Sequence, residues 1–263
     1  MSEESTSEKL KKIRKAPPPF RRVEVRSTEL LSPRMLRIVF GSDELDGFEI
    51  EAPASSVRIL VPPSPSDELV MPEWTGNQFE MPDGSRAPIR TFTPRAFDRS
   101  RNELTVDVVL HAFGHVTDWA RDASAGDVAA ISGPGRADPL PEAASHLLVG
   151  DESAIPAIAQ LLEAIPLDRT VEVHVEVTDI EAKIVLPEHE GATVTWHVTP
   201  TDATPGDAMV SAAMAVEELS DDVWVAGEAA AVQRLRKYLF DECGRARSSV
   251  TARGYWKHGR AET

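Results

Sequence analysis

The chain has 263 residues and a formal net charge of −15, with 41% hydrophobic and 27% charged residues. These values are typical of a globular protein and leave room for two domains that each bury a core, while the acidic balance argues against nucleic acid as a partner. No apolar run is long enough to span a membrane, and the charged start lacks a signal-peptide hydrophobic region, so we expect no membrane association and a soluble, cytoplasmic protein.

The cysteine and histidine content limits the redox chemistry. The single cysteine, Cys243, excludes an internal disulfide and a protein-held iron–sulfur cluster, which needs about four ligands. The seven histidines show no short metal-binding spacing, so no metal centre is expected. Any electrons must therefore enter from outside the chain.

The first part of the chain predicts a β domain. Residues 1–19 are polar and basic and end in three prolines, which indicates a disordered arm followed by a stiff spacer. From Phe20 onward, short β-type runs alternate with Pro, Gly and Asp, which is typical of an antiparallel barrel extending over 20–142. The segment 71–88 has no period and is expected to be a long loop or a disordered excursion. The expected strands cover 22–28, 35–40, 56–61, 89–93 and 104–111, and residues 126–135 would add a turn, a last strand and an exit loop.

Near His146 the pattern changes to strands that alternate with helices. This alternation predicts a parallel nucleotide-binding sheet over 143–263. The expected strands cover 146–150, 170–177, 193–198 and 223–227, and the expected helices follow residue 153 and cover 208–219 and 228–240. A Gly-x-Gly-x-x-Gly turn is missing from the sequence. Two strand-to-helix switches, at 149–153 and 225–228, remain for a nicotinamide dinucleotide, with simple chain reversal as the alternative.

Residues 90–95 read Arg-Thr-Phe-Thr-Pro-Arg and combine a cation, an aromatic ring and two hydroxyls on one expected strand. Because alternate side chains of a strand share one face, Arg90, Thr91, Phe92 and Thr93 can hold the ribityl-phosphate arm of a flavin while main-chain groups face the ring edge. The alternative is that Phe92 is an ordinary residue of a barrel core.

A second segment, 111–119, completes the expected cradle. Gly114 and Thr117 stand where a helix would start before Trp119. Free amides at a helix start bind anions, so this position suits a flavin pyrophosphate.

A flavin cradle on a β domain followed by a nucleotide-binding α/β domain resembles the ferredoxin-reductase superfamily. Within it, the chain is most similar to the siderophore-interacting proteins, which are FAD-dependent ferric-siderophore reductases. Two departures stand out. Phe92 replaces a usual Tyr, which removes one hydroxyl contact worth ~1 kcal/mol, and 115–117 read His-Val-Thr where Pro-Ala-Ser is common. The segments that carry the likeness are 90–95, 106–111, 114–120, 150–158, 224–228 and 254–260.

The resemblance implies which residues bind the cofactors. On the β domain, the expected FAD contacts are Arg90, Thr91, Phe92, Thr93, His111, Phe113, Gly114, Thr117 and Trp119. On the α/β domain, the expected cofactor contacts are Asp151, Glu152, Ala154, Gly227, Glu228, Tyr255 and Trp256. Glu152 and Glu228 begin expected helices, where the helix dipole favours acids, so a capping role is expected rather than a catalytic one. No side chain is expected to act as a proton-transfer catalyst.

A bulky, anionic ferric chelate needs a local positive pocket on an acidic protein. The resemblance places Arg58 in that pocket, with an outward-facing strand charge as the alternative. We expect Lys257 and Arg260, three residues apart, to join it from one face of a helical turn.

The resemblance implies that NADPH or NADH reduces FAD, which then passes electrons to a ferric siderophore, with a reduced ferredoxin as another donor. Glu176 could favour a free ribose hydroxyl and hence NADH. We expect a monomer. The alternatives are a generic flavin or ferredoxin-type reductase that serves a protein acceptor, a siderophore-binding carrier that has lost flavin, and a structural two-domain protein.

Overall fold

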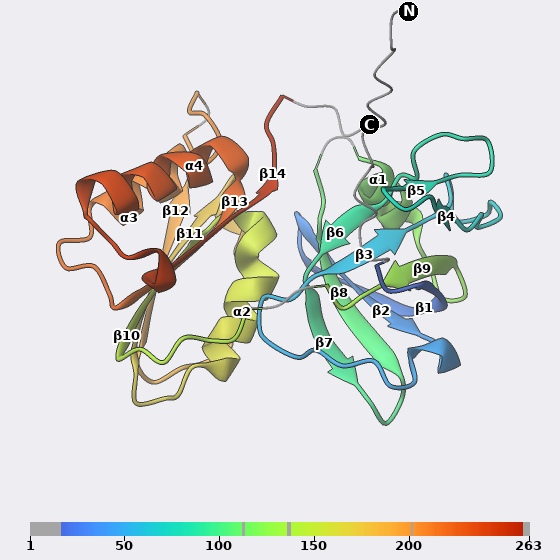
Figure 1. The fold of residues 1–263 in the computed structure, drawn as a ribbon, viewed down its shortest axis with the longest axis horizontal. Helices are drawn as coiled ribbons and strands as arrows, with labels where there is room; N and C mark the ends of the chain where they lie inside the picture. The colour runs from blue at the N-terminus through green and yellow to red at the C-terminus, as the bar shows by residue number, and fades with distance from the viewer. Residues whose placement is uncertain (1–16, 112–113, 136–137, 201, 260–263) are drawn as a thin grey trace, which may run out of the picture.

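The computed structural model describes residues 17–111, 114–135, 138–200 and 202–259. It contains a seven-stranded antiparallel sheet and a five-stranded parallel sheet that lie side by side (Figure 1). The expected basic arm therefore lies outside the described residues, apart from its last three prolines. Among the described residues, no helix is long and apolar enough to cross a membrane.

The antiparallel sheet has the order β6-β3-β9-β1-β2-β8-β7. Its two edge strands are consecutive in the chain, since β6 ends at Phe92 and β7 begins at Pro94. The sheet must therefore curl until its edges meet at Thr93, and β6 also contacts β8. The strands are β1 (Phe20–Ser32), β2 (Met35–Gly41), β3 (Val57–Leu60), β6 (Arg90–Phe92), β7 (Pro94–Asp98), β8 (Glu103–Val109) and β9 (Val128–Ser132).

Apolar and polar residues alternate along these strands, so that one face of the curled sheet, a half-barrel, can bury a core. In β8, Leu104, Val106 and Val108 are buried on one face. Helix α1 (His115–Asp122) covers the interior with Trp119, which is 1% exposed and stacks on Phe40 at a ring-centroid distance of 6.4 Å. The expected antiparallel domain is confirmed.

Two parts of the β domain differ from the prediction. Strand β7 was not expected, because it begins with a proline, which strands usually exclude from their interior. The segment 71–88 is a loop that includes a small hairpin of β4 (Glu73–Trp74) and β5 (Phe79–Glu80). The ring centroids of Phe79 and Phe20 are 5.0 Å apart, and this contact holds the hairpin against β1. The interpretation as a disordered excursion is therefore wrong.

The parallel sheet has the order β12-β11-β10-β13-β14. Its strands are β10 (Ser145–Gly150), β11 (Thr170–Val177), β12 (Ala192–Val198), β13 (Asp222–Glu228) and β14 (Val250–Trp256). Helices α3 (Asp207–Met214) and α4 (Ala229–Lys237) cover one face and share a core cluster with β10 and β13. Helix α2 (Ile155–Ala164) covers the other face and lies between the two sheets (Figure 1).

The C-terminal part of the α/β domain corrects three expectations. Helix α3 ends at Met214 rather than near residue 219, and α4 gives way to a π turn (Tyr238–Glu242). Residues 250–256 form a strand, because they pair in parallel with the edge of β13. The expected helical turn is not formed over 257–259, and Arg260 lies outside the described residues.

Candidate cofactor and substrate site

Strand β6 presents two different faces, not one shared face as expected. Its register pairs Arg58 with Thr91 and Val57 with Phe92. Directly paired residues project to the same face of a sheet. Arg58 and Thr91 therefore share one face, and Phe92 lies on the other face together with the core residue Val57. Phe92 is partly buried and packs on the β-domain core, which agrees with its interpretation as a core residue.

Arg90 shares the face of Phe92, two residues away on β6. Its guanidinium donates to the carbonyl of Ile89 at 3.1 Å. Arg90 is partly buried and Thr91 is exposed, so the strand offers a cation and a hydroxyl on opposite faces at the rim of the half-barrel.

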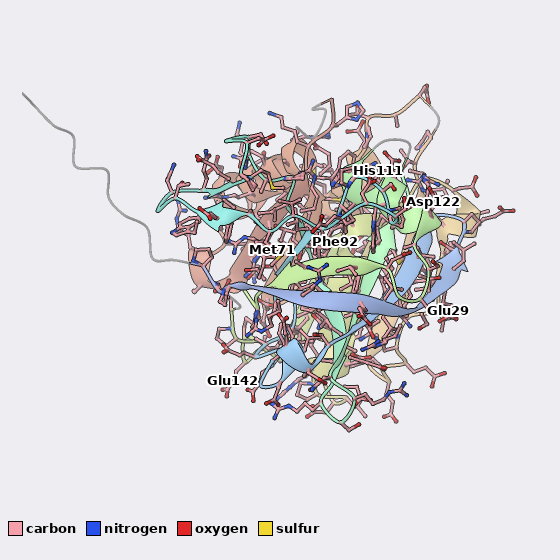
Figure 2. The ribbon with its side chains drawn as sticks, turned by 90° about the vertical axis from the view of Figure 1, so that its right-hand side faces the viewer. Glu29, Met71, Phe92, His111, Asp122 and Glu142 are labelled. Atoms are coloured by element: carbon pink, nitrogen blue, oxygen red, sulfur yellow. The ribbon has the colours of Figure 1, made fainter. Side chains whose placement is uncertain are left out.

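The start of α1 lies beside the end of β3, because Nε2 of His115 is 3.0 Å from the carbonyl of Val61. Figure 2 shows Phe92 and His111 on the same side of the long strand β1 in this view. The Thr117 hydroxyl lies 3.0 Å from Nε2 of His111, so it orients the imidazole and is itself buried. A Cβ on Gly114 would lie 2.6 Å from the His111 ring, which explains the glycine at this close approach. Phe113 lies outside the described residues.

No side chain among the described residues caps α1, and the carboxylate of Asp118 reaches only the Gly114 amide, at 3.4 Å. The first amides of the helix are therefore available to an anion. Trp119 does not belong to this site. It lies in the core of the half-barrel, so its assignment as a cofactor contact is wrong.

On the α/β domain, Asp151 joins three strand ends. Its Oδ1 accepts hydrogen bonds from the amide and hydroxyl of Ser153, at 2.9 and 2.5 Å. Its Oδ2 accepts from the amide of Glu228 at 2.8 Å and from the indole Nε1 of Trp256 at 2.7 Å. Burial raises the pKa of Asp151, and these hydrogen bonds oppose that shift. The carboxyl thus links the ends of β10, β13 and β14.

The two glutamates next to the strand ends have different roles. Glu228 caps α4 by accepting from the amides of Ala230 and Ala231, at 2.6 and 2.9 Å, as expected. Glu152 does not cap its helical turn. It accepts from Nε of Arg34 at 2.8 Å and from the amide of Thr178 at 2.8 Å, so it ties the β1–β2 turn to the parallel sheet.

Two further residues cannot take their expected roles, because both are buried inside the fold. Ala154 is fully buried, so its side chain cannot contact a cofactor. Glu176 is 4% exposed and accepts from Thr199, Gly206 and Met209 at 2.7 to 2.8 Å. With both oxygens engaged inside the fold, Glu176 cannot bind a ribose hydroxyl, and that expectation is wrong.

The two domains meet where Tyr255, near the end of β14, reaches the β domain. Its hydroxyl lies within hydrogen-bonding reach of the Thr93 side chain at the junction of β6 and β7. Burial raises the pKa of Tyr255 to about 12. The carboxyl end of the parallel sheet, where ligands bind in open α/β folds, therefore faces the rim of the half-barrel.

Polar contacts across the domain interface were not predicted from the sequence. Gln160 of α2 accepts from the amide of Ala54 at 2.9 Å and donates to the carbonyl of Pro94 at 2.6 Å. Arg95 pairs with Glu163 at 2.6 Å. The signal for Gln160 was present in the sequence, since it is a polar residue inside an apolar helix stripe.

The expected substrate cations are differently placed. Arg58 is partly buried on β3, between Thr91 and Ser132 of the neighbouring strands, and forms no ion pair within the described part of the chain. Lys257 follows β14 directly, is exposed, and likewise has no ion pair there. Two positive charges thus remain uncompensated in an acidic protein.

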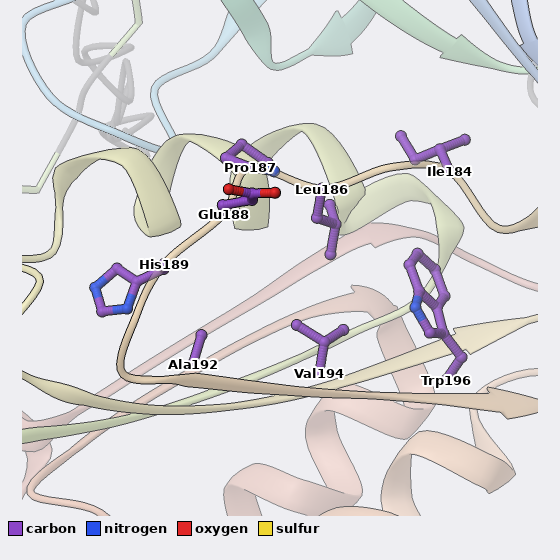
Figure 3. Close-up of a pocket in the computed structure, with 8 residues that line it drawn as sticks. All are labelled: Ile184, Leu186, Pro187, Glu188, His189, Ala192, Val194 and Trp196. Atoms are coloured by element: carbon purple, nitrogen blue, oxygen red, sulfur yellow. The ribbon is translucent and has the colours of Figure 1, made fainter.

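A separate hollow of about 350 Å³ lies at the β12 edge of the parallel sheet (Figure 3). It contains none of the residues expected to bind a cofactor or substrate. Its lining residues are Ile184, Leu186, Pro187, Glu188, His189, Ala192, Val194 and Trp196.

A curled antiparallel sheet that faces the carboxyl end of a parallel sheet is the arrangement of the two-domain ferredoxin-reductase fold. A point mutant of the ferredoxin–NADP⁺ reductase from Plasmodium falciparum shares this fold, with a TM-score of 0.65 at 10% identity over 89% of this chain and 95% of that chain.

Comparison with known sequences and structures narrows this class. The family model for siderophore-interacting FAD-binding domains matches residues 24–138, and the model for siderophore-interacting proteins matches 143–259. The ferric vibriobactin reductase of Vibrio cholerae is 34% identical over 88% of this chain and 87% of its own length. A siderophore utilization protein from T. fusca superimposes with a TM-score of 0.84 at 30% identity, over 95% of this chain and 97% of that chain. The chain belongs to the siderophore-interacting protein family.

The residues at the half-barrel rim fit FAD. The first amides of α1 have no side-chain cap among the described residues, and β6 supplies the Arg90 guanidinium on one face and the Thr91 hydroxyl on the other. The family match to an FAD-binding domain over this same region agrees with the donor set.

Proposed function

We propose that this protein is a FAD-dependent ferric-siderophore reductase that uses NADPH or NADH to reduce chelated Fe(III) and releases Fe(II). The observation that carries the proposal is the contact of Tyr255 with Thr93, which brings the carboxyl end of the parallel sheet to the half-barrel rim. Relatives with matching names support it: one is the ferric vibriobactin reductase, and another is the NADPH-dependent ferric-chelate reductase of Escherichia coli, 30% identical over 90% of this chain.

In this proposal, Arg90, Thr91, His111, Gly114 and the first amides of α1 hold FAD. Bound FAD supplies the conversion of a two-electron hydride transfer into single-electron transfers to iron. The chain's residues supply position and charge, and no proton-transfer catalyst is needed. Ferrous iron has a lower charge than ferric iron and is attracted less by anionic oxygen ligands, so reduction releases it.

The substrate in this proposal is an anionic ferric chelate, and Arg58 and Lys257 attract it. Both residues lack an ion-pair partner within the described part of the chain, so their charge is available. Arg260 is proposed as a third contact, and its position lies outside the described residues.

NADPH is the donor we favour. The acid that could select a free ribose hydroxyl, Glu176, is fully engaged inside the fold. NADH and a reduced ferredoxin are the alternative donors. We further propose that the protein acts as a monomer in the cytoplasm, where reduced nicotinamide dinucleotides are maintained.

The test begins with the absorption spectrum of the purified protein after incubation with FAD. Flavin bands are expected, and a protein that stays colourless would indicate a flavin-free siderophore carrier instead. Anaerobic stopped-flow mixing with NADPH, NADH or a reduced ferredoxin then identifies the donor. Reoxidation by a ferric siderophore should be much faster than by oxygen; a rate no faster would favour a reductase that serves a protein acceptor.

Charge reversal tests the substrate contact. Lys257→Glu changes the local charge by two units, which at about 7 Å in water costs about 1.2 kcal/mol against a monoanion, or roughly an eightfold higher KM. Lys237→Glu is the matched control, because Lys237 is an exposed lysine at the end of α4 and is not a proposed contact of the chelate. An equal effect of both variants would argue against a specific contact at Lys257.

A further inference from the structure

Two buried carboxylates hold the chain on either side of Lys257. Oδ2 of Asp151 accepts from the indole of Trp256 at 2.7 Å, and Oε1 of Glu228 accepts from the amide of His258 at 3.1 Å. The residue before Lys257 and the residue after it are thus both fixed, while Lys257 itself is exposed.

The end of β13 is shaped to admit the Asp151 carboxylate. Gly227 has a φ of +147°, and a Cβ at this position would lie 2.5 Å from Oδ2 of Asp151. A side chain at residue 227 would therefore displace the oxygen that accepts from Trp256. The glycine is needed for the carboxylate to reach across to β14.

Neither carboxylate can act on a ligand directly. Asp151 is 7% exposed and Glu228 is 2% exposed. Asp151 accepts two hydrogen bonds on each oxygen, and Glu228 divides its oxygens between the α4 cap and the His258 amide. Any influence on a substrate must therefore pass through the segment that they hold.

We infer that Asp151 and Glu228 are positioning residues that fix residues 256–258 and thereby present Lys257 to the anionic chelate. The inference rests on the proposed function and adds to it. It assigns these strand-end acids to the C-terminal segment instead of to the nicotinamide cofactor. Loss of either anchor should weaken binding of the chelate and leave reduction by the nicotinamide donor unchanged.

The anchors can be tested without flavin or substrate. In ¹⁵N-tryptophan-labelled full-length protein, the Trp256 indole N–H resonance is assigned by its loss in Trp256→Phe. Asp151→Asn should shift this resonance upfield, because the charged acceptor is lost. Asp179→Asn is the matched control, since Asp179 follows β11 and caps a short helical turn in the same way without contacting residues 256–258. An unshifted indole resonance in folded Asp151→Asn would overturn the inference.

Trypsin cleavage after Lys257 measures how firmly the segment is held. Glu228→Gln can keep its amide oxygen on the α4 cap while its amide nitrogen faces the His258 N–H, so it removes mainly the second anchor. Cleavage should accelerate about tenfold or more in this variant and in Trp256→Phe, as expected for loss of a hydrogen bond to a charged acceptor. Cleavage at the wild-type rate in both variants would contradict the inference, even if Asp151→Asn fails to fold.

Kinetics separate this inference from the proposed function. In Glu228→Gln, the KM for a ferric chelate should rise about five- to tenfold, with KM for NADPH and flavin content unchanged. A rise in both KM values would indicate a general structural role and overturn the inference. If the wild-type protein reduces no ferric chelate, the proposed function fails, while the resonance and cleavage data still decide whether the anchors exist.

Discussion

The buried Gln160 side chain should be one of the most sensitive points of the domain interface. It is 7% exposed and connects α2 to two backbone groups of the β domain, the amide of Ala54 and the carbonyl of Pro94. Gln160→Ala removes both partners at once and leaves a buried donor and a buried acceptor unsatisfied. Each such group costs about 1–3 kcal/mol, so the loss should total about 2–6 kcal/mol.

This loss is a large share of a typical unfolding free energy of about 5–15 kcal/mol. For a chain of this size, a loss of about 4 kcal/mol should lower Tm by roughly 8–16 °C in differential scanning calorimetry. Gln233→Ala is the matched control, because Gln233 is an exposed glutamine on α4 and should change Tm by no more than about 2 °C. Equal Tm shifts in the two variants would refute the claim that Gln160 connects the domains.

A second substitution at the same position tests the direction of the hydrogen bonds. Glu in place of Gln160 keeps an acceptor for the Ala54 amide but places a carboxylate oxygen against the Pro94 carbonyl. Burial and this carbonyl raise the pKa of the new carboxyl, so its neutral form is favoured in the folded state. The loss of unfolding free energy in Gln160→Glu, relative to the wild type, should therefore become smaller as the pH falls from 7 to 5, because the protonated carboxyl can donate to the carbonyl of Pro94. A loss of unfolding free energy that becomes larger at lower pH would contradict the assigned orientation of the Gln160 side-chain amide.

Three further changes have predictable outcomes. Asp107→Asn should cost about 2–4 kcal/mol in urea unfolding, because it breaks a pair in which Asp107, 4% exposed, accepts from Arg37 at 2.7 and 2.9 Å. Tyr255 should ionise near pH 12 in a titration at 295 nm, and a transition below pH 10 would contradict its burial. Because the unfolded pKa is about 10, the free energy of unfolding should fall by about 3 kcal/mol as the pH rises from 10 to 12. Phe92→Tyr should raise FAD affinity about fivefold in equilibrium dialysis if the new hydroxyl reaches the flavin, and unchanged affinity would identify residue 92 as core alone.

The order of the elements could be predicted because it depends on local periodicity. Strand β11 (Thr170–Val177) has the expected bounds, since alternating valines leave no competing pattern. Strands β7 and β14 were missed for opposite reasons. Pro94 conceals the start of β7, and β14 becomes a strand only because the free edge of β13 lies beside it. Pairing between distant segments is decided by the whole fold rather than by the local sequence.

The site was predicted less completely than the fold. Residue types predicted that His111 and Thr117 belong to one site, but not that the Thr117 side chain is buried against His111. Trp119 illustrates the limit of motif reasoning. Its place in segment 111–119 suggested a cofactor contact, whereas packing on Phe40 makes it a core residue. Burial depends on which elements pack together, and a motif does not contain that information.

The strand-end acids explain how an acidic protein can bind anions. Under the proposed function, a chain with a net charge of −15 must admit phosphates and an anionic chelate at the carboxyl end of its parallel sheet. The acids at that end are turned inward: Asp151 binds Trp256, Glu176 binds two backbone amides, and Glu228 caps α4. Each carboxylate accepts hydrogen bonds that offset its charge locally, so it repels an incoming anion less than an exposed acid would. In the proposed function, Arg58 and Lys257 attract the approaching chelate, because neither forms an ion pair within the described chain.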